Sequence, residues 1–306
     1  MTRESKRYPE DHWIRSTDAE SALQAYLEQQ SKAYSRVKND FVKELLGDLQ
    51  GKRFLDYGCG GGWFTVYAAK AGAGLVLGVD GEEAVLSTAR LFARKESVEG
   101  LCHFVAGKSF PSLPGGLRFD VILMKDVIEH VGQDQELLER AAAALVPGGT
   151  LVLSTQNSLS LNYLFQGTYH RMLLGDETWY GWDPTHVRFY TPVSLGRKLR
   201  KAGLVCKEWR SAYIIPYKIP APARSGKRFY RIDILSRVDR TFGRVFPYNR
   251  LGWNVIVKAQ TSPLIPEEDP SRIGRKSRVE VAGSIAPLPL VTSEMTDRVC
   301  RDRLET

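Results

Sequence analysis

The sequence predicts an α/β protein with a Rossmann-like sheet of seven mostly parallel strands and helices on both faces. Short apolar runs alternate with helical periodicities from residue 53 to residue 155, which is typical of a parallel sheet. The first run ends in a glycine cluster, Gly58-Cys-Gly60-Gly-Gly62, and the next run ends in Asp80. A strand, a glycine turn and a helix, with an acid after the second strand, form a nucleotide-binding corner.

Length and composition agree with this fold class. The chain has 306 residues, of which 43% are hydrophobic, enough for a single α/β domain with extensions. The net charge of +8 favours an anionic partner, but it does not choose among nucleic acid, a membrane face and an acidic substrate. The first residues lack the apolar core of a signal peptide, and the four cysteines lack zinc spacing. We therefore expect a cytoplasmic protein.

The chain divides into three parts. Residues 1–50 are predicted to form an N-terminal helical segment, either a lid over the cofactor or helices packed on the sheet edge. Residues 51–260 form the α/β domain, in which 157–192 and 214–250 are predicted substrate-side inserts. Prolines punctuate 261–306 without apolar periodicity, which predicts a disordered tail.

The glycine stretch begins the domain, between a strand at 53–57 and a helix at 63–71. Its spacing places Trp63 where a dinucleotide loop has its third glycine, and this side chain would crowd a pyrophosphate. We therefore predict an adenosine cofactor without a diphosphate, which disfavours a nicotinamide dehydrogenase. A tight structural turn is the alternative interpretation.

The second and third strands, 75–79 and 101–106, carry the next site features. Asp80 is placed to accept hydrogen bonds from ribose hydroxyls, or else to cap the helix 82–94. After the third strand stands Lys108, which cannot accept a hydrogen bond.

The motifs LDYGCGGG and LGVD resemble those of class I S-adenosylmethionine-dependent methyltransferases, and the resemblance runs from about residue 54 to residue 258. The order FDVI, IEHV and LVPGGTLVLST resembles the ubiquinone-biosynthesis O-methyltransferases and their small-molecule relatives. Many family members bind adenine through an acid where this chain has Lys108, so that contact is expected from backbone groups or Ser109. The resemblance implies S-adenosylmethionine as cofactor, bound by Asp56, Gly58, Cys59, Gly60, Asp80 and, through its backbone, Met124.

The later elements follow from periodicity, capping residues and the same resemblance. Asp134 is expected to cap a helix that Pro147-Gly148-Gly149 ends, and Thr191 to cap a helix with Pro192 at its first position. The remaining predicted strands are 119–124, 150–154, 203–209 and an antiparallel 253–257, and the predicted helices are 135–145 and 192–202.

Two inserts are assigned to the acceptor side. The aromatic residues between 163 and 190 are predicted to form the acceptor pocket. Residues 228–246 are predicted to form a basic amphipathic helix. Its arginines would form a solvated face on a packed helix, or contact an anionic surface such as the inner membrane face.

His130 is the predicted catalytic base, since it follows the fourth strand at the edge where ligands gather. If that segment is helical, Asp126, Glu129 and His130 share one face. The acid-x-x-Glu-His pattern resembles the magnesium or manganese site of small-RNA 2′-O-methyltransferases and of some ubiquinone-pathway enzymes, with His186 as a loose match to their later histidine. The shorter Asp126 and this loose match favour the version without metal.

The sequence thus predicts methyl transfer to a hydroxyl of a small-molecule, lipid-linked or glycan-linked acceptor. An RNA 2′-O-methyltransferase with a divalent metal is one alternative, but the sequence has no recognisable RNA-binding module. A non-catalytic S-adenosylmethionine-binding protein is another.

Overall fold

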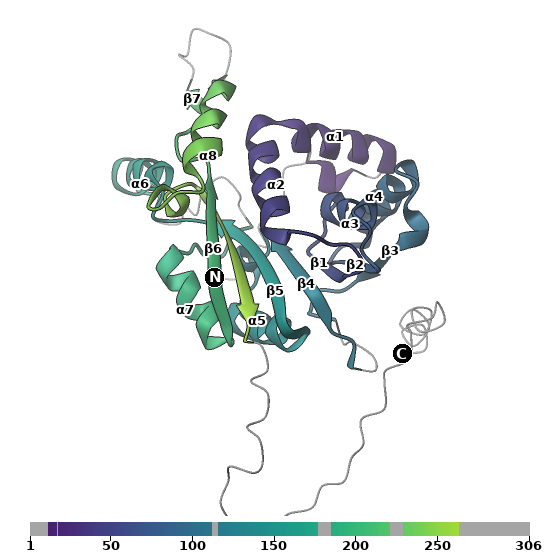
Figure 1. The fold of residues 1–306 in the computed structure, drawn as a ribbon. Helices are drawn as coiled ribbons and strands as arrows, with labels where there is room; N and C mark the ends of the chain where they lie inside the picture. The colour runs from purple at the N-terminus through teal and green to yellow at the C-terminus, as the bar shows by residue number, and fades with distance from the viewer. Residues whose placement is uncertain (1–11, 17, 112–115, 177–184, 221–228, 263–306) are drawn as a thin grey trace, which may run out of the picture.

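The computed structural model describes residues 12–16, 18–111, 116–176, 185–220 and 229–262. Its centre is a seven-stranded sheet in the order β3-β2-β1-β4-β5-β9-β6 (Figure 1). Nearly all of the predicted tail, from residue 263 onward, lies outside the described residues.

The strands confirm the predicted sheet. β9 inserts antiparallel between β5 and β6, and the other neighbours pair in parallel. A separate antiparallel pair, β7 with β8, was not predicted. The bounds are β1 Arg53–Tyr57, β2 Leu75–Asp80, β3 Cys102–Ala106, β4 Phe119–Lys125, β5 Leu145–Gln156, β6 Leu204–Ala212, β7 Lys218–Pro220, β8 Phe229–Arg231 and β9 Asn254–Thr261.

Helices cover both faces of the sheet, as predicted. The N-terminal helix region is in two pieces, α1 and α2. The α-helices are α1 Ala19–Ser31, α2 Ala33–Leu46, α3 Trp63–Lys70, α4 Glu83–Lys95, α5 Asp134–Ala143, α6 Leu161–Thr168, α7 Pro192–Lys201 and α8 Ser236–Phe242. Shorter turns are η1 Trp13–Arg15, η2 Glu99–Leu101, η4 Ile128–His130, the π-helical η5 Tyr169–Leu173, η7 Asp233–Leu235 and η8 Tyr248–Arg250.

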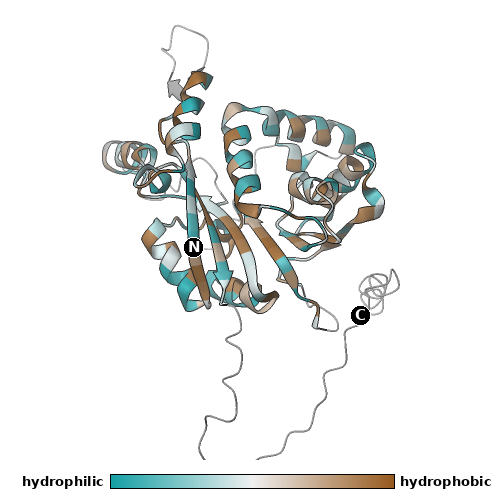
Figure 2. Cartoon of the chain, in the orientation of Figure 1, coloured by the Kyte–Doolittle hydropathy of each residue, from teal (hydrophilic) through white to brown (hydrophobic). Residues whose placement is uncertain are grey.

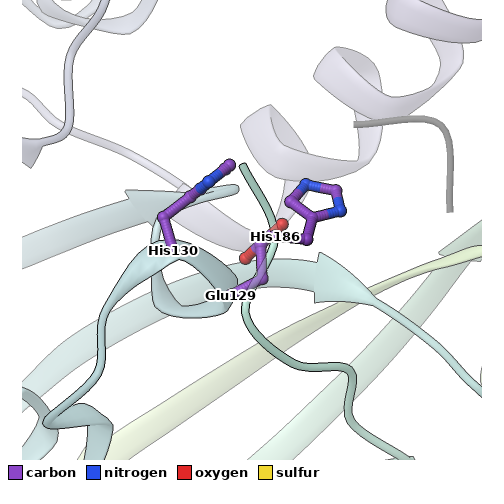
Figure 3. Close-up of side chains that lie close together, drawn as sticks. All are labelled: Glu129, His130 and His186. Carbon is purple, nitrogen blue, oxygen red and sulfur yellow. The ribbon is translucent and has the colours of Figure 1, made fainter. Parts of the chain in front are cut away.

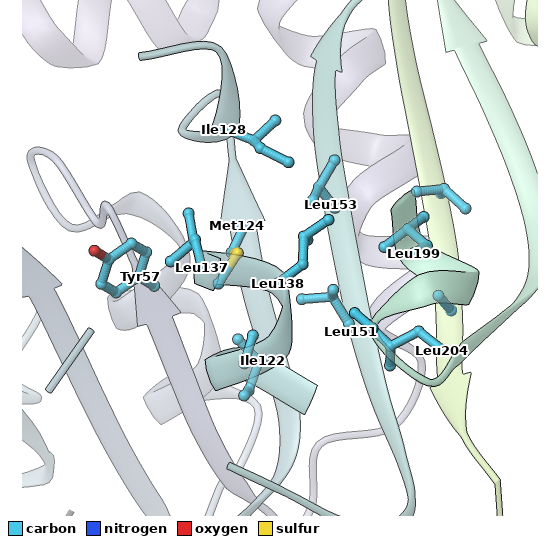
Figure 4. Close-up of a cluster of buried hydrophobic side chains, with 14 of the residues drawn as sticks. Tyr57, Ile122, Met124, Ile128, Leu137, Leu138, Leu151, Leu153, Leu199 and Leu204 are labelled. Atoms are coloured by element: carbon cyan, nitrogen blue, oxygen red, sulfur yellow. The ribbon is translucent and has the colours of Figure 1, made fainter. Parts of the chain in front are cut away.

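Two hydrophobic clusters hold these layers together. Strand side chains alternate between the faces, so each central strand contributes to both clusters. One cluster joins the sheet to α5 and α7 through residues such as Met124, Leu138 and Leu199 (Figure 4). The other joins the sheet to α2, α3 and α4 through residues such as Phe41 and Phe54. The central strands are accordingly the most continuously hydrophobic part of the chain in Figure 2.

The start of α5 corrects one prediction. Asp134 is the first residue of the helix, and Gln133 is the N-cap residue. The Asp134 carboxylate instead accepts hydrogen bonds from the Tyr190 hydroxyl at 2.8 Å and from Lys198 at 3.0 Å. The helix also ends earlier than predicted, at Ala143, because β5 begins at Leu145. Pro147-Gly148-Gly149, the predicted end of the helix, lies inside β5. The predicted cap at Thr191, with Pro192 at the first helical position, is confirmed.

The predicted helix at 228–246 is largely wrong, since only Ser236–Phe242 is α-helical. Asp239 anchors this short helix, because its buried carboxylate accepts hydrogen bonds from the Ile214 amide at 2.9 Å and from the Tyr217 hydroxyl. On its outer side Arg240 pairs with Asp40 of α2 at 2.7 Å. Arg244, which follows the helix, pairs with Glu44 of α2. These two ion pairs attach α8 and the residues after it to α2.

In the described part of the chain, we find no helix with the length and apolar character needed to cross a bilayer.

Candidate active site

The glycine loop lies at the carboxyl end of β1. Gly58, Gly60 and Gly62 all have positive φ, which glycine adopts readily and other residues rarely do. The Gly58 amide donates to the Val79 carbonyl at 2.7 Å, which closes the loop against β2. A Cβ atom on Gly58 would lie 2.3 Å from the Val127 side chain, so backbone approach also requires glycine here.

Asp80 reaches the same loop from the end of β2. Its Oδ2 atom accepts a hydrogen bond from the Gly60 amide at 2.9 Å, and its Oδ1 accepts from the Glu82 amide at 3.3 Å. Burial raises the pKa of this carboxyl, although the two amides oppose the shift. The acid therefore lies beside the loop, where a ribose-binding role requires it, and it also holds the start of α4.

Asp56, Cys59 and Met124, which the resemblance assigns to the cofactor, are buried. Asp56 accepts a hydrogen bond from the Thr65 hydroxyl at 2.8 Å, and burial raises its pKa to about 7. The Met124 side chain faces the core (Figure 4), which leaves only its backbone for a cofactor contact.

The N-terminal segment contacts the glycine loop and also packs on the sheet. The Trp13 and Tyr26 rings are 4.7 Å apart, and the Tyr26 hydroxyl accepts from the Trp63 amide at 3.2 Å. A Cβ on Gly61 would lie 2.6 Å from the Tyr26 ring. Meanwhile α2 packs against the sheet through Phe41.

Beyond the end of β4, three side chains converge: Glu129, His130 and His186 (Figure 3). Their potential ligand atoms all lie within 4.8 Å of one another, and the two imidazole centroids are 4.8 Å apart. A hydrogen bond of 2.9 Å from the Val187 amide to the Glu129 carbonyl joins the two segments. The predicted approach of His186 from the insert is therefore observed.

Each member of this cluster has a neutral hydrogen-bonding neighbour. The Thr155 hydroxyl donates to Glu129 Oε2 at 2.8 Å, and the Thr185 hydroxyl lies 2.9 Å from His130 Nδ1. The Gln156 amide nitrogen lies 3.3 Å from His186 Nε2. Such supporting contacts fix ring orientation and tautomer.

Glu129 is the most unusual member electrostatically. It is fully buried, and among the described residues its Oε1 atom has no hydrogen-bond donor. Burial and the neighbouring Asp126 raise its pKa to about 8. A buried oxygen without a donor, next to two imidazoles, suits a divalent cation or a donating hydroxyl group, so the donor set fits the metal that the resemblance suggested.

Asp126 corrects the predicted metal set, because it lies outside this cluster. The segment is a 3₁₀ turn rather than an α-helix, and Asp126 has a left-handed φ of +58°. Its carboxylate forms an ion pair with Lys38 of α2 and accepts from the Ser154 hydroxyl at 2.9 Å. Burial alone would raise the pKa of Asp126, but Lys38 and Lys125 outweigh it and hold that pKa low.

Sequence reasoning missed Lys38 and the supporting residues Thr155, Gln156 and Thr185. Thr155 and Gln156 follow the predicted fifth strand directly, and polar residues at that edge are a usable signal of a site. Lys38 carries no such signal, because a lysine next to apolar helix positions is ordinarily solvent-exposed.

Some of the aromatic side chains predicted for the acceptor pocket pack together beside the cluster. The Tyr163 and Phe189 rings are 5.0 Å apart, and Phe189 lies 5.7 Å from Trp253 and 5.8 Å from His186. The predicted members Trp179, Tyr180 and Trp182 lie outside the described residues.

The sheet order and the glycine loop with Asp80 are those of a class I S-adenosylmethionine-dependent methyltransferase, which uses S-adenosylmethionine as cofactor. A family model described as a methyltransferase domain matches residues 26–208, and the chain belongs to that family.

Curated relatives give the same family. The chain is 32% identical to the ubiquinone biosynthesis O-methyltransferase of Alkalilimnicola ehrlichii over 173 residues, which cover 56% of this chain and 68% of the relative. It is 31% identical to the enzyme of that name from Aeromonas salmonicida over 184 residues, 59% and 74% of the two chains.

Solved structures support the fold. Magnesium protoporphyrin IX methyltransferase from Synechocystis, with bound SAH, aligns with a TM-score of 0.51 at 16% identity, covering 79% of this chain and 95% of that one.

Proposed function

We propose that this protein transfers the methyl group of S-adenosylmethionine to a hydroxyl oxygen, with His130 as the base, on a small-molecule, lipid-linked or glycan-linked acceptor. The observation that carries the proposal is the cluster of Glu129, His130 and His186 at the carboxyl edge of the sheet, beyond β4. Ligands of open α/β sheets bind at this edge, so the cofactor and the acceptor would meet there.

The reaction needs two things from the protein. S-adenosylmethionine supplies a methyl group on a sulfonium, and the thioether that leaves needs no proton. The protein must align the acceptor oxygen with the methyl carbon and accept the hydroxyl proton. As the carbon–oxygen bond forms and the carbon–sulfur bond breaks, that proton passes to the base.

In this mechanism we assign the proton-accepting role to Nε2 of His130. Nδ1 lies 2.9 Å from the Thr185 hydroxyl, and if Nδ1 carries the ring hydrogen it donates to that oxygen. Nε2 then has the free lone pair that a base requires. Thr185 thus positions His130 in this mechanism.

A second version of the mechanism uses a divalent cation, and the donor-free Oε1 of Glu129 favours it. Glu129, His130 and His186 would hold magnesium or manganese, which would lower the pKa of the acceptor hydroxyl. Two imidazoles and one carboxylate suit manganese better than magnesium.

Chelation separates the two versions. A metal enzyme loses turnover in EDTA, keeps cofactor binding and recovers with added manganese. In the metal-free version EDTA has no effect, whereas His130→Ala lowers turnover by about 10²–10⁴. His103→Ala, on the edge strand β3, is the matched histidine control. Full activity of His130→Ala with and without chelator would refute both mechanisms.

The acceptor class is tested by turnover with labelled cofactor against lipid, glycan and RNA fractions. Large apolar side chains are exposed on α6 and near α8, with Phe165 75% and Phe246 70% exposed, which supports a lipid-linked acceptor presented at a membrane face. RNA is less favoured, because Arg240 and Arg244 pair with acids of α2. Label that enters RNA alone, with steep salt dependence, would overturn the lipid proposal.

A non-catalytic cofactor-binding protein remains the third outcome of that assay. It would bind S-adenosylmethionine in calorimetry and transfer no label to any fraction.

A further inference from the structure

Glu129, His130 and His186 offer three ligands to a cation, which leaves open which side chain supplies a fourth ligand. The pattern Asp126-x-x-Glu129-His130 pointed to Asp126, but this carboxylate is already engaged by three neighbours. Lys38 forms an ion pair with it, Ser154 donates to it at 2.9 Å, and Lys125 lies 3.4 Å from it. The Asp126 backbone also leaves β4 in the left-handed region and is held by the Ser154 carbonyl at 3.0 Å.

We propose that the carboxamide of Gln156, instead of the carboxylate of Asp126, completes a divalent-cation site with Glu129, His130 and His186. The inference rests on the proposed function only in taking this cluster as the reaction centre.

Gln156 is held firmly at the correct edge of the sheet. It is the last residue of β5, pairs with Asn254 of β9, and its carbonyl accepts from the Tyr190 amide at 3.3 Å. Its side-chain nitrogen lies 3.3 Å from His186 Nε2. The carboxamide is therefore next to the cluster, on a strand with little freedom to move.

Two buried oxygens in this region lack a donor. Neither Gln156 Oε1 nor Glu129 Oε1 receives a hydrogen bond from the described residues, and such oxygens are costly to bury. A half-turn of the carboxamide exchanges its nitrogen and oxygen with little change in shape. The oxygen then lies on the His186 side, and a cation there would bind it together with Glu129 Oε1 and the imidazole nitrogen.

The exchange of an acid for an amide changes the chemistry of the site. Two carboxylates and two imidazoles would carry a charge of −2, whereas Glu129 with Gln156 carries −1. The lower charge weakens divalent binding in general, and two nitrogen ligands favour manganese over magnesium. The site should therefore prefer Mn²⁺ to Mg²⁺ and release it readily.

The test is a titration of the full chain with Mn²⁺ in the absence of acceptor, in which electron paramagnetic resonance measures the bound Mn²⁺. Gln156→Leu should weaken Mn²⁺ binding by about tenfold or more, and Gln156→Glu should tighten it. Gln260→Leu is the matched control, because Gln260 donates to Thr150 at the far end of the same strand pair. Melting curves confirm that each variant is folded.

The role of Asp126 is tested with the double variant Lys38→Met/Asp126→Asn, which removes both charges of the ion pair together. Its Mn²⁺ affinity should stay within about twofold of the parent. A loss as large as that of Gln156→Leu would return the fourth position to Asp126 and overturn the proposal.

Two outcomes separate this proposal from the proposed function. Turnover that ignores EDTA, in a protein that does not bind millimolar Mn²⁺, overturns the cation site and leaves methyl transfer intact. Mn²⁺ binding that follows the predicted order of variants, without transfer to any acceptor, supports the site and overturns the function.

Discussion

The ion pair between Lys38 and Asp126 joins the N-terminal helix α2 to the end of β4, beside the cluster of Glu129, His130 and His186. The Lys38 side chain is 6% exposed and that of Asp126 is 28% exposed. Burial lowers the pKa of Lys38 to about 8, while Asp126 opposes that shift. We predict that removing either partner destabilises the protein, but by different amounts.

The structure sets the two magnitudes. Removing one partner of a buried pair usually costs about 3–5 kcal/mol, because the other charge is left uncompensated. In Lys38→Met the orphan is Asp126, which keeps Ser154, Lys125 and some solvent, so we expect a loss of about 2–3 kcal/mol. In Asp126→Asn the orphan is a nearly dry ammonium, and losing its proton at neutral pH costs about 4–5 kcal/mol. The second variant should therefore be the less stable.

Urea unfolding of the two single variants and the double variant measures these losses. The double variant Lys38→Met/Asp126→Asn should recover most of the stability, because no buried charge remains. The ion pair would have no such role if both single variants lost less than about 1 kcal/mol, or if the losses in the double variant were simply additive.

Three further predictions concern the cofactor loop and the cluster. Asp80→Ala should weaken S-adenosylmethionine binding by about 1.5–3 kcal/mol in calorimetry, since the ribose would lose its acceptor and the Gly60 amide its partner; unchanged affinity would remove Asp80 from the site. Gly61→Ala should destabilise the protein by about 1–3 kcal/mol, because its Cβ meets the Tyr26 ring. The losses of Gly61→Ala and Tyr26→Ser should be less than additive in melting curves of the double variant; a neutral Gly61→Ala would show that the ring moves freely. The raised pKa of Glu129 contributes folding stability that is present below about pH 4.5 and is lost as pH rises through about 8. Glu129→Gln should therefore reduce the pH dependence of the free energy of unfolding, measured with urea in the presence of chelator. An unchanged pH dependence would contradict the raised pKa of Glu129.

The sequence predicted best those features that depend on neighbours along the chain. The apolar runs located six of the seven strands of the main sheet to within about four residues at each end, the exception being β5, which starts earlier, and the glycine spacing located the loop. Thr191 and Pro192 predicted the start of α7, because a cap is a contact between residues a few positions apart. By contrast, the 228–246 periodicity misled, because Asp239, which anchors α8, takes its partners from Tyr213, Ile214 and Tyr217.

At the cluster beyond β4, the sequence by itself determined that Asp126, Glu129 and His130 follow the strand and that His186 comes from the insert. Only the tertiary structure decided which of them meet. Asp126 and Glu129 are three positions apart, but the left-handed turn at Asp126 directs its carboxylate to Lys38, 88 positions away in the chain. Gln156 reaches His186 because β5 lies beside β4. Residue spacing predicts contacts only where the backbone is regular, whereas at a strand end the partner of a side chain is whichever group the packed elements bring within reach.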